Sequence, residues 1–412
     1  MSTRRRWLAL MLVLCPVPIA VETVKKFSVV VDDLRGANTI QAAGTMVAPR
    51  DSGAVEEIPG RQAILSILRK VNSYQLAHPV LEERQSAHRS KDLLRRPWPR
   101  ATWYTGVMGV WKATKDSSFL EQALDYGRQL RWQVGEEQVG ANRLFPIQIW
   151  AELYFAKMDR AMIEPSIVWL STPDPLSPAG SKRWYLDARD SLKEHPVAYV
   201  DSLYGAPALA MLAQATGDKK YLDIMNSFFD DVTGQLFDQE SGLYYRDPSY
   251  IGQRTTNGKK ILWSRGNGWA FAGIARVLEY LPKNNHSRQR YVDIFVRQAG
   301  ELIKRQGADG MWRANLDDPN EFPDPESSGT GFFCFGLAWG INQGFLNRQE
   351  YLQAVRKAWR GLTQNVSPGG KVLWGQLVDD QPRATARDST HEYVTGAFLL
   401  AGSEVYRLAH AK

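Results

Sequence analysis

The stretch GWAFAGIARVLEYLP (residues 268–282) is followed by YVDIFVRQAGELIKR (residues 291–305). The first stretch is apolar on almost every side, whereas the second carries a single apolar stripe. A helix that is apolar all round must be buried, and an amphipathic helix packs outside it. The two stretches therefore predict a helical hairpin with one inner and one outer helix.

This plan recurs along the chain, and alternation typical of strands is scarce from about residue 60 onward. The hairpins and the separate inner-type helices that we expect are Thr102–Leu130, Asp201–Val232, Gly268–Arg305, Thr330–Leu362, Phe145–Phe155 and Thr395–Leu408. From Asp201 onward, inner helices begin about 60 to 65 residues apart, as in a helical-hairpin repeat. Six such pairs would close into two concentric rings, an all-α (α/α)6 barrel. The alternative is an open helical solenoid, whose repeats are usually more uniform.

The N-terminus predicts export. Arg4–Arg6 precede the apolar run WLALMLVLCPVPIA, residues 7–20. A positive segment before a short apolar run is typical of a secretory signal peptide, and this run is too short to span a bilayer. We expect a signal peptide at residues 1–21, an N-terminal extension at 22–58 and the barrel domain at 59–412, exported to the periplasm or secreted. A lipoprotein signal at Cys15 is a weaker alternative.

Charge and cysteine content exclude several classes of protein. The formal net charge is +7, and loss of the three arginines Arg4–Arg6 with the signal peptide leaves +4. The remaining Lys and Arg form no block that could follow a phosphate backbone, so we expect no nucleic-acid partner. Cys334 would then be the single cysteine, and no Cys/His spacing suits a metal. We expect no metal and no cofactor.

Aromatic and polar residues gather where the inner helices begin. The chain has 14 Trp, 16 Tyr and 15 Phe, and flat aromatic faces suit the C–H faces of sugar rings. Uneven loops at one end of a barrel also suit a cleft. The residues near these helix starts that we consider as substrate contacts are Trp103, Tyr104, Asn142, Gln148, Arg246, Trp263, Arg265, Asn267, Trp269 and His391.

Two positions have a more specific chemistry. Asp201 has a plain explanation as an N-terminal helix residue, but a carboxyl among aromatic rings would have a raised pKa and could donate a proton. In WSRGNGW, residues 263–269, Arg265 stands between two tryptophans and suits a bidentate grip on a carboxylate. Glu326 is a possible second acid or a helix-capping residue, and His391 lines the cleft or lies in a surface loop.

Three long segments carry a family resemblance. They read VDSLYGAPALAMLAQATGDKKYLD (residues 200–223), NGKKILWSRGNGWAFAGIARVLEYLP (257–282) and EYVTGAFLLAGSEVYRL (392–408). These segments resemble the unsaturated rhamnogalacturonyl/glucuronyl hydrolases of glycoside hydrolase families 88 and 105. The likeness extends, with the motifs in the same order, from about residue 60 to the C-terminal helix.

The resemblance implies both a fold and a reaction. Such enzymes are (α/α)6 barrels that act without a metal or cofactor on the Δ4,5-unsaturated uronic acid left by a polysaccharide lyase. Asp201 matches the family's catalytic Asp, which protonates C4 before water adds at C5 and the opened ring expels the rest of the chain. Trp263, Arg265 and Trp269 match the element that stacks on the sugar and binds its carboxylate. The expected partner is thus an acidic oligosaccharide, and the protein is a monomer or homodimer.

The chain departs from this family at two positions. Asn142 stands where relatives usually carry Asp, although the Gln that often follows is present as Gln148. Arg246 follows Tyr244-Tyr245 where some relatives place His, and it could contact the acid group. Two alternatives therefore stay open: another (α/α)6 enzyme on acidic sugars, either a glycosidase or a lyase, or a sugar-binding protein impaired in turnover by Asn142.

Overall fold

The computed structural model describes residues 57–80, 97–136, 140–171 and 199–409, which lie in one compact unit, Val55–Lys412. The predicted signal peptide and most of the predicted extension fall outside the described residues. The described part contains twelve α-helices that alternate between two layers. The inner helices are α2 (Trp98–Thr114), α4 (Leu144–Lys157), α6 (Pro207–Thr216), α8 (Ser264–Tyr280), α10 (Ser327–Asn342) and α12 (Glu392–Leu408). The outer helices are α1 (Arg61–Ala77), α3 (Ser117–Leu130), α5 (Glu164–Ser171), α7 (Lys220–Leu236), α9 (Arg288–Lys304) and α11 (Arg348–Gln364).

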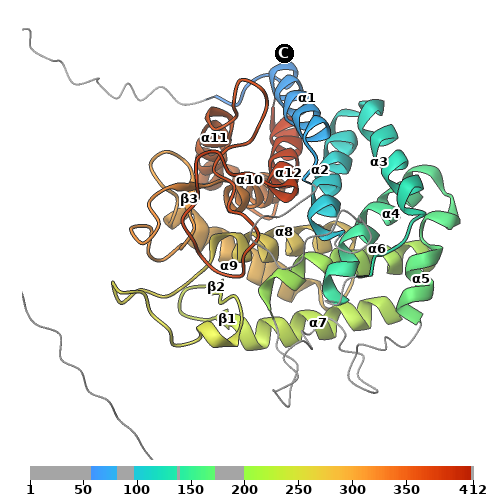
Figure 1. The fold of residues 1–412 in the computed structure, drawn as a ribbon. Coiled ribbons are helices and arrows are strands. Elements are labelled where there is room, and N and C mark those ends of the chain that lie inside the picture. Colours follow the sequence, from blue (N-terminus) through green and yellow to red (C-terminus); the bar gives the residue numbers. More distant parts are fainter. Residues whose placement is uncertain (1–56, 81–96, 137–139, 172–198, 410–412) are drawn as a thin grey trace, which may run out of the picture. The chain divides into compact units, whose positions relative to one another are not determined.

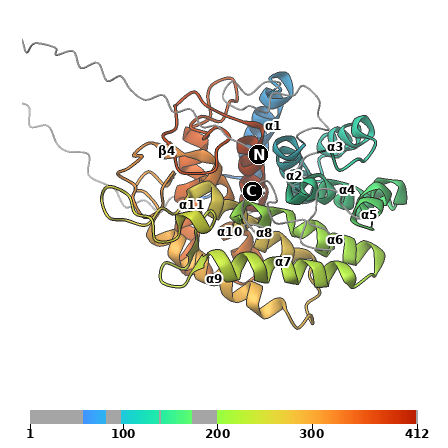
Figure 2. The same ribbon diagram turned by 60° about the horizontal axis from the view of Figure 1, so that its bottom comes forward.

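The inner helices form a closed ring. Each one packs against the next in chain order, and α12 packs against α2. Figure 1 shows α1, α3, α5, α7 and α11 around the periphery, with α8, α10 and α12 nearer the middle, and Figure 2 shows α6 beside α7. This closure confirms the (α/α)6 barrel and rules out the open solenoid.

Sequence composition explains the two layers. In α10 every residue from Ser327 to Ile341 is buried, as its uniformly apolar sequence predicts. In α11 the buried side chains recur every three or four residues, which gives one inward face. The predicted turn between α2 and α3 is confirmed: Lys115 has φ 62°, and the Asp116 side chain caps α3 by accepting from the Ser118 N–H.

Glycines allow the ring to close. A methyl group on Gly396 of α12 would lie 2.3 Å from the carbonyl oxygen of Thr102 in α2. A methyl group on Gly106 of α2 would lie 2.5 Å from the carbonyl oxygen of Gly396. These two backbones approach closely because neither residue has a Cβ, so any larger residue would push the first and last inner helices apart.

Short elements connect the helices. All but one lie before the start of an inner helix, and the exception, at Arg160–Met162, follows the end of α4. Two antiparallel pairs are formed by β1 (Phe237–Asp238) with β2 (Leu243–Tyr244), and by β3 (Trp312–Arg313) with β4 (Pro325–Glu326). The 3-10 helices are η1 (Gly140–Arg143), η2 (Arg160–Met162), η3 (Val200–Gly205) and η4 (Pro248–Tyr250). No described helix has both the length and the apolar character needed to cross a membrane.

One helix start differs from the prediction. We expected an inner helix to open at Asp201, but Asp201 lies in η3 and the α-helix begins only at Pro207. Proline has no N–H for an α-helical bond to the residue four positions earlier, so it is favoured at the first turn and not inside a helix. The 3-10 helix therefore carries Asp201 ahead of α6.

Candidate active site

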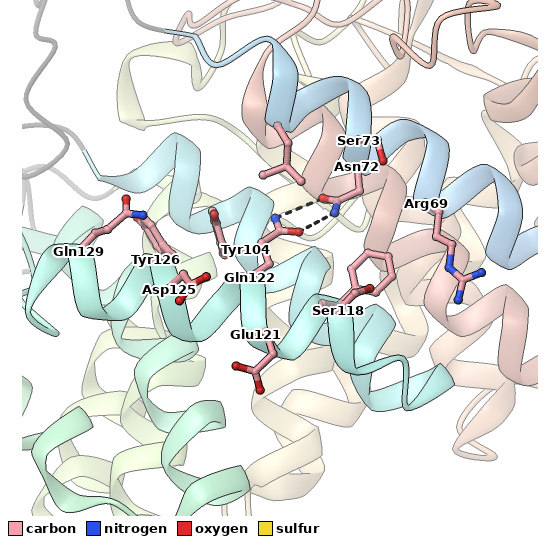
Figure 3. Close-up of a pocket in the computed structure, with 12 residues that line it drawn as sticks. Arg69, Asn72, Ser73, Tyr104, Ser118, Glu121, Gln122, Asp125, Tyr126 and Gln129 are labelled. Carbon is pink, nitrogen blue, oxygen red and sulfur yellow. Dashed lines mark hydrogen bonds between the residues drawn. The ribbon is translucent and has the colours of Figure 1, made fainter.

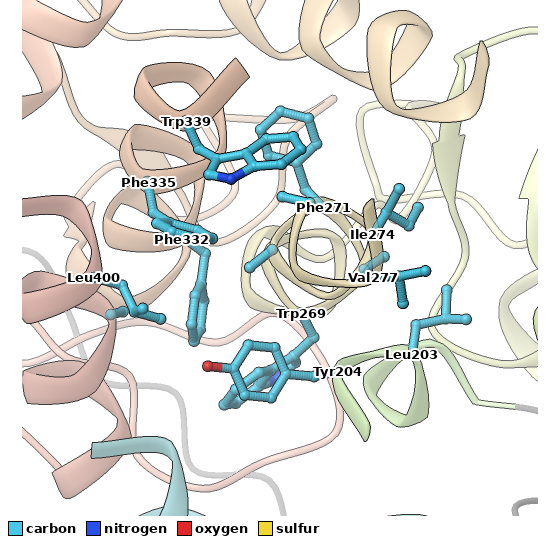
Figure 4. Close-up of a cluster of buried hydrophobic side chains, with 14 of the residues drawn as sticks. Leu203, Tyr204, Trp269, Phe271, Ile274, Val277, Phe332, Phe335, Trp339 and Leu400 are labelled. Carbon is cyan, nitrogen blue, oxygen red and sulfur yellow. The ribbon is translucent and has the colours of Figure 1, made fainter. Parts of the chain in front are cut away.

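Six aromatic rings meet at the beginning of the inner helices, one from each helix or its leading turn. They are Trp98, Phe145, Tyr204, Trp269, Phe332 and Tyr393. Trp269 is central, with ring centroids 4.9 Å from Tyr204 and 4.5 Å from Phe332, and Figure 4 shows these three side chains together. We call this set the aromatic layer. Contacts between these aromatic side chains hold the six inner helices together across the axis of the barrel.

Asp201 is the acidic group of this region. Its side chain is 19% exposed, its Oδ2 lies 3.7 Å from Nη2 of Arg246, and its buried Oδ1 has no hydrogen-bond partner. Burial raises the pKa of Asp201 to about 6, against the lowering effect of the Arg246 and Arg265 cations. Asp201 can therefore be protonated in weakly acidic solution and can donate that proton.

Arg246 is tied to Asp201 through the backbone as well as by charge. The Val200 N–H donates to the Arg246 carbonyl oxygen at 2.8 Å, which fixes the loop after β2 beside η3. The guanidinium donates through Nη1 to Asp247 Oδ2 at 2.9 Å and lies over the Tyr199 ring. Burial lowers the pKa of Arg246, but Asp201 and Asp247 raise it more, so it remains a cation.

Arg265, predicted to grip a carboxylate, is buried and bonded within the protein. It is 1% exposed and stacks on Trp263 and Tyr393, with its guanidinium carbon 4.6 Å and 4.9 Å from their ring centroids. Its terminal nitrogens donate to the carbonyl oxygens of Gln376, Leu377 and Asp379. Arg265 thus fixes residues 376–379, and these bonds occupy the guanidinium expected to grip a substrate carboxylate.

Several other predicted contacts are also buried and bonded within the protein. Trp263 donates to Gln376, and Trp103 donates to Asn72. Asn267 bonds to both backbone groups of Tyr244, and His391 Nδ1 accepts from the Glu392 N–H and so caps α12. The predicted residues that are at most 3% exposed are Trp103, Gln148, Trp263, Arg265, Asn267, Trp269 and His391. The surface of these side chains is covered by other parts of the protein, and their predicted contacts with substrate stay predictions.

Tyr104 faces a separate groove. It stacks on Tyr126 with ring centroids 4.0 Å apart and lines a cavity of about 520 Å³ between α1 and α3 (Figure 3). The lining residues come from α1, α2 and α3, and none is among the neighbours of Asp201. The structure therefore does not place Tyr104 with the acidic group.

Asn142 lies on the element that packs against η3. It belongs to η1, is partly exposed, and η1 packs against η3. A methyl group on Gly205 of η3 would lie 2.9 Å from the Ala141 carbonyl oxygen, which shows how close the two backbones are. Of the residues predicted at the site, the structure thus groups Asp201, Arg246 and Asn142 at partly exposed positions.

One wall of the site was not predicted from the sequence. Residues 376–381, QLVDDQ, lie opposite η3: Asp380 is close enough for its charge to raise the pKa of Asp201. Gln381 Oε1 accepts from the Tyr250 hydroxyl at 3.2 Å, which links this wall to η4. The paired aspartates Asp379 and Asp380 between two helical regions were the available signal. Glu326, considered as a second acid, is wholly buried and caps α10 by accepting from Ser328 and Gly329.

The described residues contain no group of three or more His, Cys, Asp or Glu side chains that could hold a metal ion.

Comparisons with known proteins agree with this geometry. The profile of Glycosyl Hydrolase Family 88 matches residues 68–409. The chain is 33% identical over 333 residues to the unsaturated 3S-rhamnoglycuronyl hydrolase of Alteromonas sp. (strain LOR), with 77% of this chain and 79% of that protein covered. A family 88 glycosyl hydrolase from Bacteroides vulgatus has a TM-score of 0.72 at 29% identity, covering 85% of this chain and 99% of that one. A solved structure described as a polysaccharide lyase has a TM-score of 0.70 at 30% identity, covering 84% and 98%.

The barrel and these matches define a glycoside hydrolase. The chain belongs to glycosyl hydrolase family 88.

Proposed function

We propose that this protein removes a Δ4,5-unsaturated uronic acid from the non-reducing end of acidic oligosaccharides that a lyase has produced. The observation that carries the proposal is Asp201: a carboxyl with a pKa of about 6, one oxygen unpaired, next to a fixed cation. The name of the Alteromonas relative adds the substrate class, an unsaturated glycuronyl residue linked to a rhamnose-type sugar.

The reaction needs one carboxyl group. The substrate ring is an enol ether, so protonated Asp201 donates to C4 and forms a C–H bond, and positive charge develops at C5 and the ring oxygen. The Asp201 carboxylate then removes a proton from water as the water oxygen bonds to C5. The resulting hemiketal opens and releases the remaining sugar chain. A group that acts first as acid and then as base works best with a pKa near the working pH.

Arg246 is the group best suited to bind the uronate carboxylate. Its side chain is 15% exposed, and its Nη1 and Nη2, which carry two N–H groups each, face Asp247 and Asp201. A guanidinium held in place by two carboxylates can still offer a charge-assisted hydrogen bond to a third. This assigns to Arg246 the carboxylate contact that was expected of Arg265.

Asn142 is compatible with turnover in this scheme. An amide next to η3 can hydrogen-bond a sugar hydroxyl or the attacking water, although it cannot act as a base. Because Asp201 supplies both the acid and the base, the mechanism needs no second carboxylate at residue 142.

The ultraviolet absorbance of the conjugated double bond tests this proposal. Purified protein is mixed with lyase digests of several uronate-containing polymers, beginning with rhamnose-containing glucuronans. A hydrolase of this type destroys the chromophore, so absorbance falls. A lyase acting on intact polymer creates the chromophore, so a rise in absorbance would support the lyase alternative instead. Saturable binding without any change in absorbance would support a sugar-binding protein.

We also propose that the protein is exported. The support is the positive segment Arg4–Arg6 followed by the apolar run of residues 7–20. Expression of the full chain in a Gram-negative host, followed by fractionation and N-terminal sequencing, tests this. Export predicts a product that begins near residue 22 outside the cytoplasm, whereas a full-length cytoplasmic product would contradict it.

A further inference from the structure

The orientation of Asp201 depends on a short helix. Asp201 lies on η3, whose six residues, Val200–Gly205, form a 3-10 helix. Hydrogen-bond geometry in 3-10 helices is poorer than in α-helices, and side chains three residues apart lie on the same side. Asp201 and Tyr204 are three residues apart, so whatever holds Tyr204 also holds the backbone turn that carries Asp201.

Tyr204 is held at two points from two inner helices. Its carbonyl oxygen accepts a hydrogen bond from Gln148 Nε2 of α4 at 2.6 Å, and its hydroxyl lies 2.6 Å from Thr105 Oγ1 of α2. Its ring is fully buried in the aromatic layer, next to Trp269 and Phe332 (Figure 4). On the other side of η3, Gly273 of α8 packs directly on the Leu203 carbonyl oxygen.

Arg276 determines which way the Gln148 amide points. Arg276 Nε donates to Gln148 Oε1 at 2.8 Å. A guanidinium can only donate and a backbone carbonyl can only accept, so the amide NH₂ must face Tyr204. Arg276 is itself held by Glu152 Oε1 at 3.2 Å, and both residues are almost fully buried.

We propose that Gln148, oriented by Arg276, is a positioning residue for the Asp201 proton donor. Gln148 is wholly buried and both ends of its amide are bonded, so it acts on the reaction through the Tyr204 carbonyl and not through the substrate. The chain of contacts runs from Arg276 to Gln148, to the Tyr204 backbone, and one 3-10 turn back to Asp201. This inference rests on the function proposed above.

The test compares Gln148→Met with Asn342→Leu. Methionine keeps the length of the side chain but removes the donor to Tyr204, and Arg276 keeps its pairing with Glu152. Asn342 is the matched control, since it donates from α10 to Glu404 of α12 and does not contact η3. Each variant loses a side-chain amide that bonds one inner helix to a neighbouring element. Two quantities are measured for each: kcat and KM on the active digest, and the Asp201 pKa by NMR of protein labelled at the aspartate carboxyl carbons, with Asp201→Asn to assign the signal.

We expect Gln148→Met to lower kcat by about tenfold to a hundredfold, because small misplacements of a catalytic group have effects of that size. KM should stay within about threefold, since no ground-state contact is lost. The Asp201 pKa should fall towards the ordinary aspartate value as η3 moves into solvent. Asn342→Leu should lose stability to a similar extent but keep kcat and the Asp201 pKa.

Two results would overturn the positioning role: a Gln148→Met enzyme with wild-type kcat and Asp201 pKa, or equal losses of kcat in both variants after correction for the folded fraction. Failure of the proposed function is a separate result, because wild-type protein would then be inactive on every digest. The NMR titration does not depend on turnover, so an Asp201 pKa that shifts in Gln148→Met alone would still support positioning.

Discussion

Two carboxyl groups of this barrel differ in burial and in pKa: the Asp201 side chain is 19% exposed, whereas the Glu152 side chain is 1% exposed. Asp201, at the mouth, has one unpaired oxygen and a single cation 3.7 Å away, and its burial raises its pKa to about 6. Glu152, between α4 and α8, also has one buried oxygen without a partner, Oε2, but its Oε1 accepts from Lys112, Arg276 and Tyr280. Burial raises its pKa, yet the two cations outweigh that effect and hold the pKa below the ordinary value. The number and distance of donors, not burial alone, decides whether a carboxyl is a stable anion or a proton donor.

The sharpest way to break this comparison is Asp201→Asn. The variant removes the proton donor, so kcat should fall by about 10²- to 10⁴-fold while oligosaccharide still binds. Removing an ionised carboxyl whose folded pKa is raised should also increase stability above pH 6, on the order of 1 kcal/mol. Stopped assays and thermal unfolding at pH 8 measure both effects. Asp230→Asn is the control, because Asp230 is an exposed aspartate of α7 that pairs with Arg290 away from the site. An Asp201→Asn enzyme with near-wild-type turnover would exclude Asp201 as the acid.

Glu152→Leu tests the other half of the comparison. The change leaves the buried Arg276 without its carboxylate partner, so the free energy of unfolding should fall by about 3–5 kcal/mol. Urea unfolding measures the loss. Glu279→Gln serves as the control, since Glu279 pairs with the same Lys112 but its side chain is 27% exposed, and about 1 kcal/mol or less is expected. Equal losses of unfolding free energy in Glu152→Leu and Glu279→Gln would show that burial of the ion pair does not determine its contribution to stability.

Arg246→Gln should affect both binding and protonation. Loss of a charge-assisted bond to the uronate, worth about 1.5–3 kcal/mol, should raise KM by about tenfold or more. Because the Arg246 cation lowers the Asp201 pKa, its removal should move that pKa upward and shift the loss of activity to higher pH. Arg254→Gln, an exposed arginine further along the same loop, should leave both values unchanged. A normal KM in Arg246→Gln would mean that another group binds the carboxylate.

The last test is the pH dependence of the wild-type enzyme, which changes no residue. The acid form of Asp201 is required, so kcat should fall as pH rises through about 6. A profile of kcat measured between pH 4 and 9 in buffers of constant ionic strength shows this directly. An activity that instead rises through this range would indicate that Asp201 enters the reaction as a base.

The fold could be predicted because apolar periodicity reports it directly: a helix such as α10, apolar on every side, has to be enclosed. Asp201 and Arg246 could also be singled out from the sequence, since charged groups among aromatics are unusual. Arg265 could not be assigned, because an arginine between two tryptophans looks the same whether it faces a ligand or backbone carbonyls. Residues 376–381 have neither helical nor strand periodicity, so the sequence did not place them. Their position opposite Asp201 depends on the hydrogen bonds that Arg265 donates to the carbonyl oxygens of Gln376 and Asp379.

The way the ring closes also bears on how the chain folds. Thr395 donates to Gln75 across 320 positions of sequence, and Arg100 pairs with Glu392 across 292 positions. Contacts between such distant residues form slowly, because a long loop must close before they can stabilise anything. Helix α12 must be synthesised before α2 can pack against it. A chain truncated before α12 should therefore lack a complete barrel mouth. We therefore expect each molecule to become active only after α12 has packed against α2.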